Sequence, residues 1–203
     1  MFQRYDFTAM PVVDNENRMV GIITIDDVMD IMEEEATEDI EKMAAIVPSD
    51  KTYFKTSILQ TYKNRMPWLL ILMVSATFTG AIITSYENAL ASYVILTAYI
   101  PMLMDTGGNA GSQASVSVIR GLSLDEIQFK DLPRALWKEI RVAVMCGLTL
   151  ATANFLKLLL LDRLPVEIAL IVCLTLVIVV VFAKTIGCCL PLVAAKIHLD
   201  PAV

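Results

Sequence analysis

The sequence lacks the residues that most enzymes and nucleic-acid-binding proteins need. Only one of its 203 residues is a histidine, His198, so no H-E-x-x-H pair of zinc ligands exists. Neither a G-x-S-x-G motif nor a phosphate-binding lysine motif occurs. Basic residues number 16 against 22 acidic ones, and no basic footprint for nucleic acid is present. We therefore expect a protein that is not an enzyme and that binds no nucleic acid.

The cysteines also fail to form any pattern of metal ligands. None of the four belongs to a CxxC pair, and their spacing does not suit zinc. All four fall inside apolar runs: Cys146, Cys173, Cys188 and Cys189. We expect them to be small, buried apolar side chains.

Hydrophobic residues are abundant but unevenly distributed. They make up 56% of the chain, whereas soluble domains contain about 45–50% apolar residues. Almost all of the surplus lies after Pro67, while residues 1–66 resemble an ordinary soluble segment. The chain therefore has two parts, of which the second is a membrane segment.

Four runs are long enough to cross a bilayer as helices, which takes ~20 apolar residues. The second run is interrupted by Pro101 and by Gly107-Gly108, and Pro101 is expected to kink its helix. A fifth helix is expected to start at Asp200-Pro201. The predicted fold is an α-helical polytopic membrane protein with four complete transmembrane helices and the start of a fifth, preceded by a small α/β segment. The four runs are 67–85, 89–118, 140–161 and 165–195.

Basic residues concentrate in alternate loops, which predicts the orientation of the helices. The N-terminus and the loop after the second span are expected to face the cytosol. The expected location of the protein is the inner (cell) membrane. Lys184 lies inside the fourth run, where it either snorkels to the cytosolic interface or takes part in ion passage. The basic residues of the cytosolic loops are Lys51, Lys55, Lys63, Arg65, Arg120, Lys130, Arg134, Lys138, Arg141 and Lys196.

The soluble segment predicts a hairpin followed by a helix. Pro11–Asp14 and Val20–Thr24 have strand character, and the polar residues 15–17 between them favour a turn. An EF-hand starting at Asp14 is excluded, because Met19 stands where that loop needs glycine and Ile25 where it needs glutamate. The helix should begin near Ile25.

That helix is strongly acidic. Between Asp26 and Glu41 there are nine acids and no base. Like charges four residues apart each cost a few tenths of a kcal/mol, and divalent cations bound to the carboxylates would remove this repulsion. A solvated acidic face is the alternative. At 100° per residue, one face contains Asp27, Asp30, Glu34, Glu38 and Glu41.

The second span contains polar residues at membrane depth. Asp105 falls near mid-bilayer, where a carboxylate costs at least ~2.5–3.5 kcal/mol and should face water or a partner. Asn109, Ser112 and Gln113 share its helical face and could line a hydrated path. Gly107 and Gly111 form a GxxxG pattern, which allows close helix packing instead.

Two stretches resemble known families. The segment PVVDNENRMVGIITIDDVMDIM resembles the closing half of a CBS domain. DTGGNAGSQ at 105–113, followed by Val-Ile-Arg120-Gly121, resembles the second-span motif of the MgtE family of magnesium transporters. Further similarity occurs at Phe182–Gly187, at Leu190-Pro191 and at the terminal Asp200-Pro-Ala-Val.

The resemblance implies a homodimer whose pore runs between the subunits, bordered by Asn109 and the Gly107-Gly108 backbone. Together with Asp105 and Gln113 from the polar helical face, these are the pore-lining candidates. It further implies gated influx of Mg²⁺ that stops when cytosolic Mg²⁺ binds the acidic residues. Mg²⁺ is then both the transported and the regulatory ion. The metal-binding candidates are Asp27, Asp30, Glu35, Glu38, Asp39 and Asp6 on the cytosolic side and Asp200 at the mouth of the pore.

The resemblance also predicts how the chain is divided. A partial CBS domain with the acidic helix is expected over 1–47, a connecting helix over 48–66 and the transmembrane domain over 67–203. The ion-selecting aspartate of the family is expected beyond Val203. ATP is a further candidate ligand of a complete CBS pair. The alternatives are transport of Co²⁺ or Mn²⁺, and a nucleotide-regulated CBS membrane protein.

Overall fold

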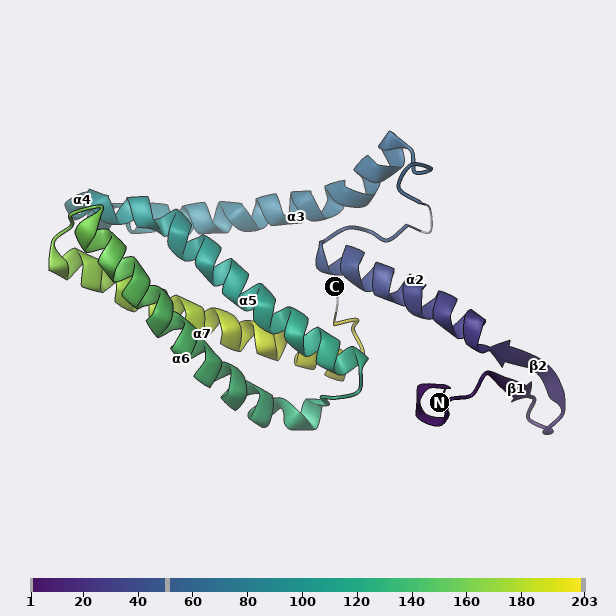
Figure 1. Ribbon diagram of the computed structural model, residues 1–203. Coiled ribbons are helices and arrows are strands. Elements are labelled where there is room, and N and C mark those ends of the chain that lie inside the picture. The colour runs from purple at the N-terminus through teal and green to yellow at the C-terminus, as the bar shows by residue number, and fades with distance from the viewer. Residues whose placement is uncertain (1, 50–51, 202–203) are drawn as a thin grey trace. The chain divides into compact units, whose positions relative to one another are not determined.

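The computed structural model describes residues 2–49 and 52–201 (Figure 1). Lys51, which was used to predict the orientation, and Ala202 and Val203 of the terminal motif lie outside the described residues. The chain divides into two compact units, Met1–Ile71 and Leu72–Val203.

The first unit starts with a short helix, α1 (Phe2–Tyr5), and an antiparallel hairpin. Strand β1 (Ala9–Val13) pairs with β2 (Met19–Thr24), with Ala9 opposite Thr24. The connecting turn contains Asn17 at a positive φ of 60°, a conformation that asparagine tolerates better than most residues. The predicted strands and turn are therefore confirmed.

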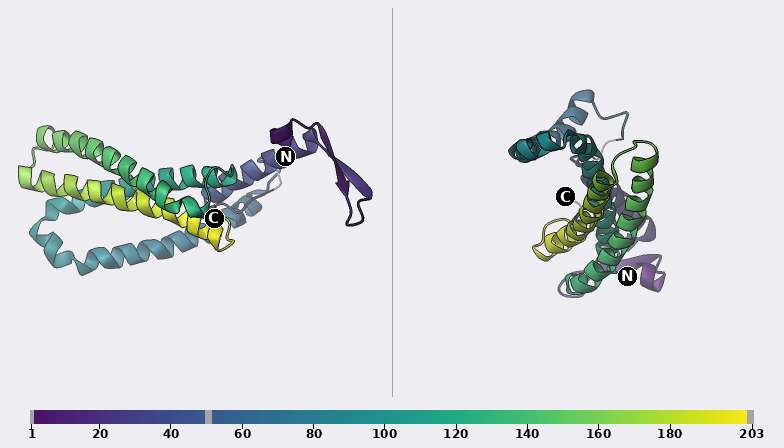
Figure 2. Two further views of the ribbon diagram at one scale, coloured as in Figure 1. Left: turned by 90° about the horizontal axis from the view of Figure 1, so that it is seen from below. Right: turned by 90° about the vertical axis from the view of Figure 1, so that its left-hand side faces the viewer.

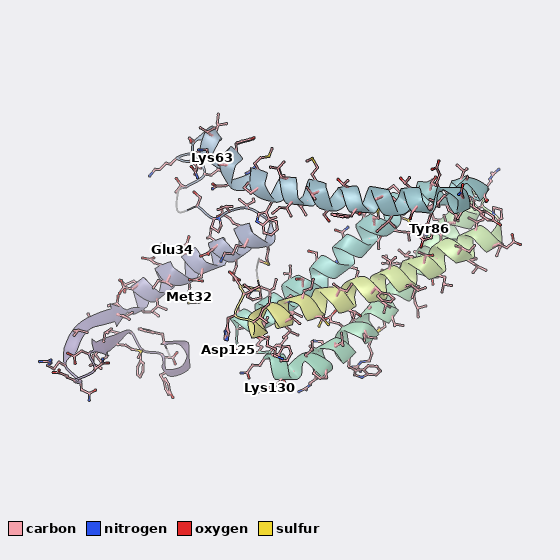
Figure 3. All side chains as sticks on the ribbon, turned by 180° about the vertical axis from the view of Figure 1, so that it is seen from behind. Met32, Glu34, Lys63, Tyr86, Asp125 and Lys130 are labelled. Carbon is pink, nitrogen blue, oxygen red and sulfur yellow. The ribbon has the colours of Figure 1, made fainter. Side chains whose placement is uncertain are left out.

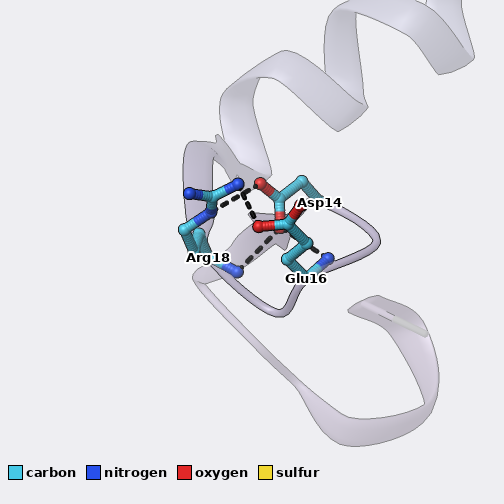
Figure 4. Close-up of polar contacts among 3 residues, drawn as sticks. All are labelled: Asp14, Glu16 and Arg18. Carbon is cyan, nitrogen blue, oxygen red and sulfur yellow. Dashed lines mark hydrogen bonds and ion pairs between the residues drawn. The ribbon is translucent and has the colours of Figure 1, made fainter.

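Asp14 holds this turn together through its carboxylate (Figure 4). The carboxylate accepts hydrogen bonds from the N–H groups of Glu16 at 2.8 Å and Arg18 at 2.9 Å. The Arg18 guanidinium also forms ion pairs with the carboxylates of Asp14 and Glu16. The backbone hydrogen bond from Arg18, more than any other contact, lowers the pKa of Asp14 below its ordinary value.

Helix α2 (Ile25–Met43) follows β2 without a break, as predicted (Figure 1). Its first turn is closed by a capping box, in which the Asp27 carboxylate accepts from the Thr24 backbone N–H at 2.8 Å and from the Thr24 hydroxyl at 2.5 Å. The helix ends at Met43, and Ala45 has a positive φ of 57°.

Helix α3 runs from Ile58 to Ser85 as one element. Of the described residues in the connecting helix predicted over 48–66, only those from Ile58 onward are helical. The first span was predicted to begin at Pro67, whereas Pro67 lies inside α3. The side chain of Asn64 is buried, and its backbone oxygen accepts from the Val47 N–H at 3.0 Å, which ties the segment after α2 to the start of α3.

The second unit contains a core of three long helices. Helix α7 (Val166–Lys196) is the middle one and packs against both α5 (Ile100–Ser123) and α6 (Leu132–Leu160) (Figure 2). Short elements precede α5 and α6, namely α4 (Glu87–Ser92), η1 (Val94–Tyr99) and η2 (Phe129–Asp131). Buried apolar side chains form three successive clusters along α7, which include Val172, Val180 and Leu192. Of the four cysteines predicted to be buried, Cys173 and Cys188 are buried, whereas Cys146 and Cys189 are only half-buried.

Three of the four predicted membrane spans are helices long and apolar enough to cross a bilayer: α3, α6 together with η2, and α7. The predicted second span does not form one complete helix. It is divided into α4, η1 and α5, and Pro101 stands in the first turn of α5 rather than at a kink. Gly107-Gly108 do not interrupt α5 either.

Candidate functional site

Helix α5 has two different faces, and this difference defines the candidate ion path. One face is buried and consists of small or apolar residues, among them Gly107, Ala110, Ala114 and Val118. The other face is exposed. It contains the polar residues that the sequence placed on one arc, Asp105, Asn109, Ser112 and Gln113, together with Gly108. We call these five residues the polar stripe.

The buried face packs against α7 at very short range. A β-carbon at Gly107 would lie 2.7 Å from Val179 Cγ1, and one at Gly111 would lie 3.2 Å from the Ala183 carbonyl oxygen. A β-carbon at Gly187 would overlap the carbonyl oxygen of Gly111. The helix-packing interpretation of the GxxxG pattern therefore fits both of its glycines.

The predicted pore-lining residues consequently divide between the two faces. Asp105, Gly108, Asn109 and Gln113 lie on the exposed face, whereas Gly107 lies on the packed face. Within the stripe, the Asn109 amide donates a hydrogen bond of 3.2 Å to the Asp105 carboxylate. Both residues are exposed, so this hydrogen bond lies on the outer face of α5.

A cavity lies beside the stripe, with a buried ion pair in its wall. It is lined by residues of α5, α6 and α7: Ser112, Gln113, Val116, Ser117, Glu139, Val142 and Lys184. Lys184 is 5% exposed, and its Nζ lies 3.9 Å from Glu139 Oε2. The prediction that Lys184 snorkels to the interface is therefore wrong, because its ammonium group turns inward to a carboxylate of α6.

The acidic face of α2 borders a second cavity. In Figure 3, Glu34 and the apolar Met32 point to different sides of the helix, as the sequence pattern predicted. The chain after α2 returns along this face, and the Ser49 N–H donates to the Glu41 carboxylate at 3.0 Å. The cavity is lined by Asp30, Glu33, Glu34, Glu35, Thr37, Glu38, Glu41, Pro48, Ser49 and Thr52.

The predicted metal-binding carboxylates have different surroundings. Asp30, Glu35 and Glu38 line this cavity, although Glu38 also pairs with Lys42 at 2.5 Å. Asp27 caps α2, and the Thr24 hydroxyl and N–H that bond to it lower the pKa of its carboxyl. Asp39 is half-buried, whereas Asp6, near the N-terminus, and Asp200, after α7, are exposed. Over residues 2–49 and 52–201, no three acidic, histidine or cysteine side chains converge as a metal-binding group.

Sequence reasoning missed two polar contacts. Glu139 was assigned to a loop because the third span was predicted from Ile140, whereas α6 already begins at Leu132. The second contact joins η1 to the loop between α6 and α7, where the Tyr99 hydroxyl donates to Asp162 at 2.9 Å and Lys157 contacts the same carboxylate at 2.8 Å. Pro133 favours the first turn of a helix, and this signal could have predicted the earlier start of α6 that includes Glu139. No signal in the sequence indicated the contact between Tyr99 and Asp162.

Comparison with known proteins identifies the same segments. Residues 100–203 match the MgtE family, described as divalent cation transporters, and residues 1–34 match the CBS domain. The match to MgtE covers α5, α6 and α7, and therefore both the polar stripe and the Lys184–Glu139 pair.

Three curated relatives share the name magnesium transporter MgtE. Identity is 38% over 199 residues with the protein of Thermus thermophilus, 32% over 203 residues with that of Bacillus subtilis and 27% over 200 residues with that of Enterococcus faecalis. These alignments cover 98%, 100% and 98% of this chain, but only 44%, 44% and 43% of the relatives. The chain therefore spans less than half the length of the relatives that it matches.

Proposed function

Because this chain belongs to the MgtE family of divalent cation transporters, we propose that the protein carries Mg²⁺ passively into the cell along a path bordered by the polar stripe of α5. The three named relatives are magnesium transporters. Mg²⁺ gives up its water reluctantly, so the stripe contacts a largely hydrated ion through carboxylate and amide oxygens.

The observation that supports this proposal is the exposure of polar groups on a helix that packs along the membrane-spanning helix α7. Asp105 and Asn109 face outward although α5 buries its other face against α7. Exposure of a carboxylate to lipid costs at least ~2.5–3.5 kcal/mol, so the stripe needs water or protein to cover it. A second copy of the chain that places its own stripe opposite would enclose a water-filled path, and we propose such a homodimer.

The distribution of basic residues supports a cytosolic N-terminus in the cell membrane. Lys63 stands near the start of α3, and Lys130 stands in the connection between α5 and α6 (Figure 3). The opposite ends of the helices carry few basic groups. The positive-inside rule then places the start of α3, the connection between α5 and α6, and the end of α7 on the cytosolic side.

We further propose that cytosolic Mg²⁺ closes the path by binding the acidic face of α2. Three carboxylates that border its cavity, those of Asp30, Glu35 and Glu38, repel one another when no cation is bound. Asp39 and Asp6 complete the proposed set of regulatory ligands, whereas we propose that Asp200 binds Mg²⁺ at the cytosolic mouth of the path. Asp27 contributes less than its position suggests, since one of its oxygens already caps the helix.

The transport proposal is tested with the complete gene product in proteoliposomes. We expect Mg²⁺ influx that decreases as Mg²⁺ is raised on the side of the CBS segment. Competition by Mn²⁺ and Co²⁺ in the same assay distinguishes a magnesium transporter from a transporter of another divalent cation. Absence of Mg²⁺ flux from a folded protein at every concentration would contradict the transport proposal.

Closure by Mg²⁺ is tested separately, with the triple variant Asp30→Asn, Glu35→Gln and Glu38→Gln. These changes remove charge from the cavity of α2 without touching the Asp27 cap. We expect influx that stays high at a Mg²⁺ concentration that stops the wild type. Glu16→Gln, in the hairpin turn, is the matched control and should close normally.

A nucleotide-regulated CBS protein is the second candidate, because residues 1–34 match the CBS domain. ATP is its candidate ligand. A thermal shift of the complete protein with ATP, measured without Mg²⁺ and then with it, separates nucleotide regulation from regulation by Mg²⁺ alone.

A further inference from the structure

The ion pair between Lys184 and Glu139 is unusual because both charges lie well inside the helical unit. Lys184 is twelve residues before the last residue of α7, and Glu139 is seven residues after the first residue of α6. At ~1.5 Å per residue, these positions are about 18 Å and 10 Å from the corresponding helix ends. Charged side chains at such a depth cost free energy, and in membrane proteins they pair with one another and mark ion pathways.

The geometry of the pair leaves both partners with unused hydrogen-bonding capacity. A separation of 3.9 Å between Nζ and Oε2 permits electrostatic attraction but exceeds a hydrogen bond. Among the residues that the structure describes, neither side chain has another hydrogen-bond partner. The ammonium and the carboxylate therefore share their cavity with the hydroxyl and amide groups of Ser112, Ser117 and Gln113.

The cavity is continuous with the polar stripe. Ser112 and Gln113 belong to both, so an ion that moves along the exposed face of α5 passes the opening of the cavity. At that point it meets a carboxylate, which attracts a divalent cation, and an ammonium group, which repels it. The charges of the pair sum to zero, so the cavity gives little net attraction.

We propose that Lys184 determines how tightly this part of the path holds a passing divalent cation, because it neutralises Glu139. Without the ammonium group, the Glu139 carboxylate would bind the hydrated cation and delay its release. Without the carboxylate, the ammonium group would repel the cation. This role rests on the proposed transport of Mg²⁺ along the stripe.

The test measures Mg²⁺ uptake by the complete protein as a function of Mg²⁺ concentration. In Lys184→Met we expect the half-saturating concentration to fall by about tenfold, with a lower maximal rate, because one unopposed carboxylate then faces the ion. In Glu139→Gln the half-saturating concentration should rise. The double variant, again neutral, should return to within about threefold of the wild type.

Lys196→Met is the matched control, since it removes a lysine from the same helix outside the cavity. The Lys196 ammonium lies 4.2 Å from the centre of the Phe129 ring, and its loss should leave the half-saturating concentration unchanged. Loss of a partner from a buried pair can prevent folding. Gln113→Glu therefore serves as the second variant, because it adds the negative charge on an exposed side chain, and it should also lower the half-saturating concentration.

The possible failures are distinguishable. A wild type that transports no Mg²⁺ contradicts the proposed function. A wild type that transports Mg²⁺, beside folded Lys184→Met and Gln113→Glu variants with an unchanged half-saturating concentration, overturns the role of Lys184. A purely structural ion pair would lower the melting temperature and the amount of folded protein without shifting that concentration.

Discussion

Gly187 of α7 contacts the carbonyl oxygen of Gly111 of α5 so closely that no β-carbon fits between the two backbones. Both glycines lie inside long helices, and the obstructing atom belongs to the main chain. The contact therefore fixes the rotation of α5 about its axis, and with it the outward direction of the polar stripe.

Gly187→Ala should separate α5 from α7 and destabilise the helical unit. Overpacking of this kind costs about 1–3 kcal/mol. The measurement is thermal unfolding followed by a thiol-reactive dye, which reports exposure of the buried Cys173 and Cys188. Gly108→Ala is the matched control, because nothing lies within 4 Å of its added carbon and alanine favours a helix over glycine by up to ~1 kcal/mol. Equal melting temperatures for the two variants would contradict the packing argument.

Cysteines placed on the two faces of α5 should differ in their access to water. We expect Asn109→Cys and Gln113→Cys to react with a membrane-impermeant maleimide, and Ala110→Cys and Ala114→Cys to stay unlabelled beyond the wild-type background. The physical reason is the burial of both alanines against α7. Absence of labelling at Asn109→Cys and Gln113→Cys would contradict an aqueous path along the stripe, and labelling at Ala110→Cys and Ala114→Cys would contradict the burial of the opposite face.

Asp27→Asn should loosen the start of α2, because the amide accepts the Thr24 hydrogen bonds more weakly than the carboxylate does. Hydrogen exchange of the backbone amides of residues 24–29 in the complete protein measures this effect. Asp26→Asn, one residue earlier on the same turn, is the control and should exchange at the wild-type rate.

The pKa of Asp27 is lowered in the folded state, so the cap is stabilising above the ordinary carboxyl pKa and is lost only as pH falls below about 4.

Tyr99→Phe should release η1 from the loop between α6 and α7. The Asp162 carboxylate accepts hydrogen bonds from the Lys157 ammonium and from the Tyr99 hydroxyl. Both lower the pKa of Asp162, and the hydrogen bond from Lys157 has the larger effect. We expect faster hydrogen exchange over residues 94–99 in the variant. Tyr93→Phe, an exposed tyrosine of the same segment, is the control. In the wild type, the contact should persist at neutral pH and weaken only below about pH 4, since the folded-state pKa is depressed.

Local patterns were sufficient for the elements that short-range chemistry determines. Two short runs with strand character around a polar turn predicted the hairpin, and the step from Thr24 to a run of helix-forming residues predicted the start of α2. The apolar runs predicted α3, α6 and α7, because hydropathy over ~20 residues is a property of the sequence alone. The domain boundaries and the metal-binding roles of Asp6, Asp27, Asp30, Glu35, Glu38, Asp39 and Asp200 stay predictions.

The same reasoning failed where a residue has two possible roles. Pro101 could kink a helix or begin one, and it begins α5. Gly107 could border a path or allow close packing, and it packs against Val179. Lys184 could reach the interface or take part in ion passage, and in the structure it pairs with Glu139. In each case, the deciding atom belongs to a segment distant in the sequence.

The sequence by itself determined that this is a membrane protein of the MgtE type with an acidic helix before its first span, because composition, periodicity and motifs are carried by consecutive residues. The sequence placed the polar residues of α5 on one arc, but only the tertiary structure decided that this arc is exposed and that the opposite side is buried. That choice depends on the close approach of Gly111 to Gly187, which arises when helices far apart along the chain pack against one another.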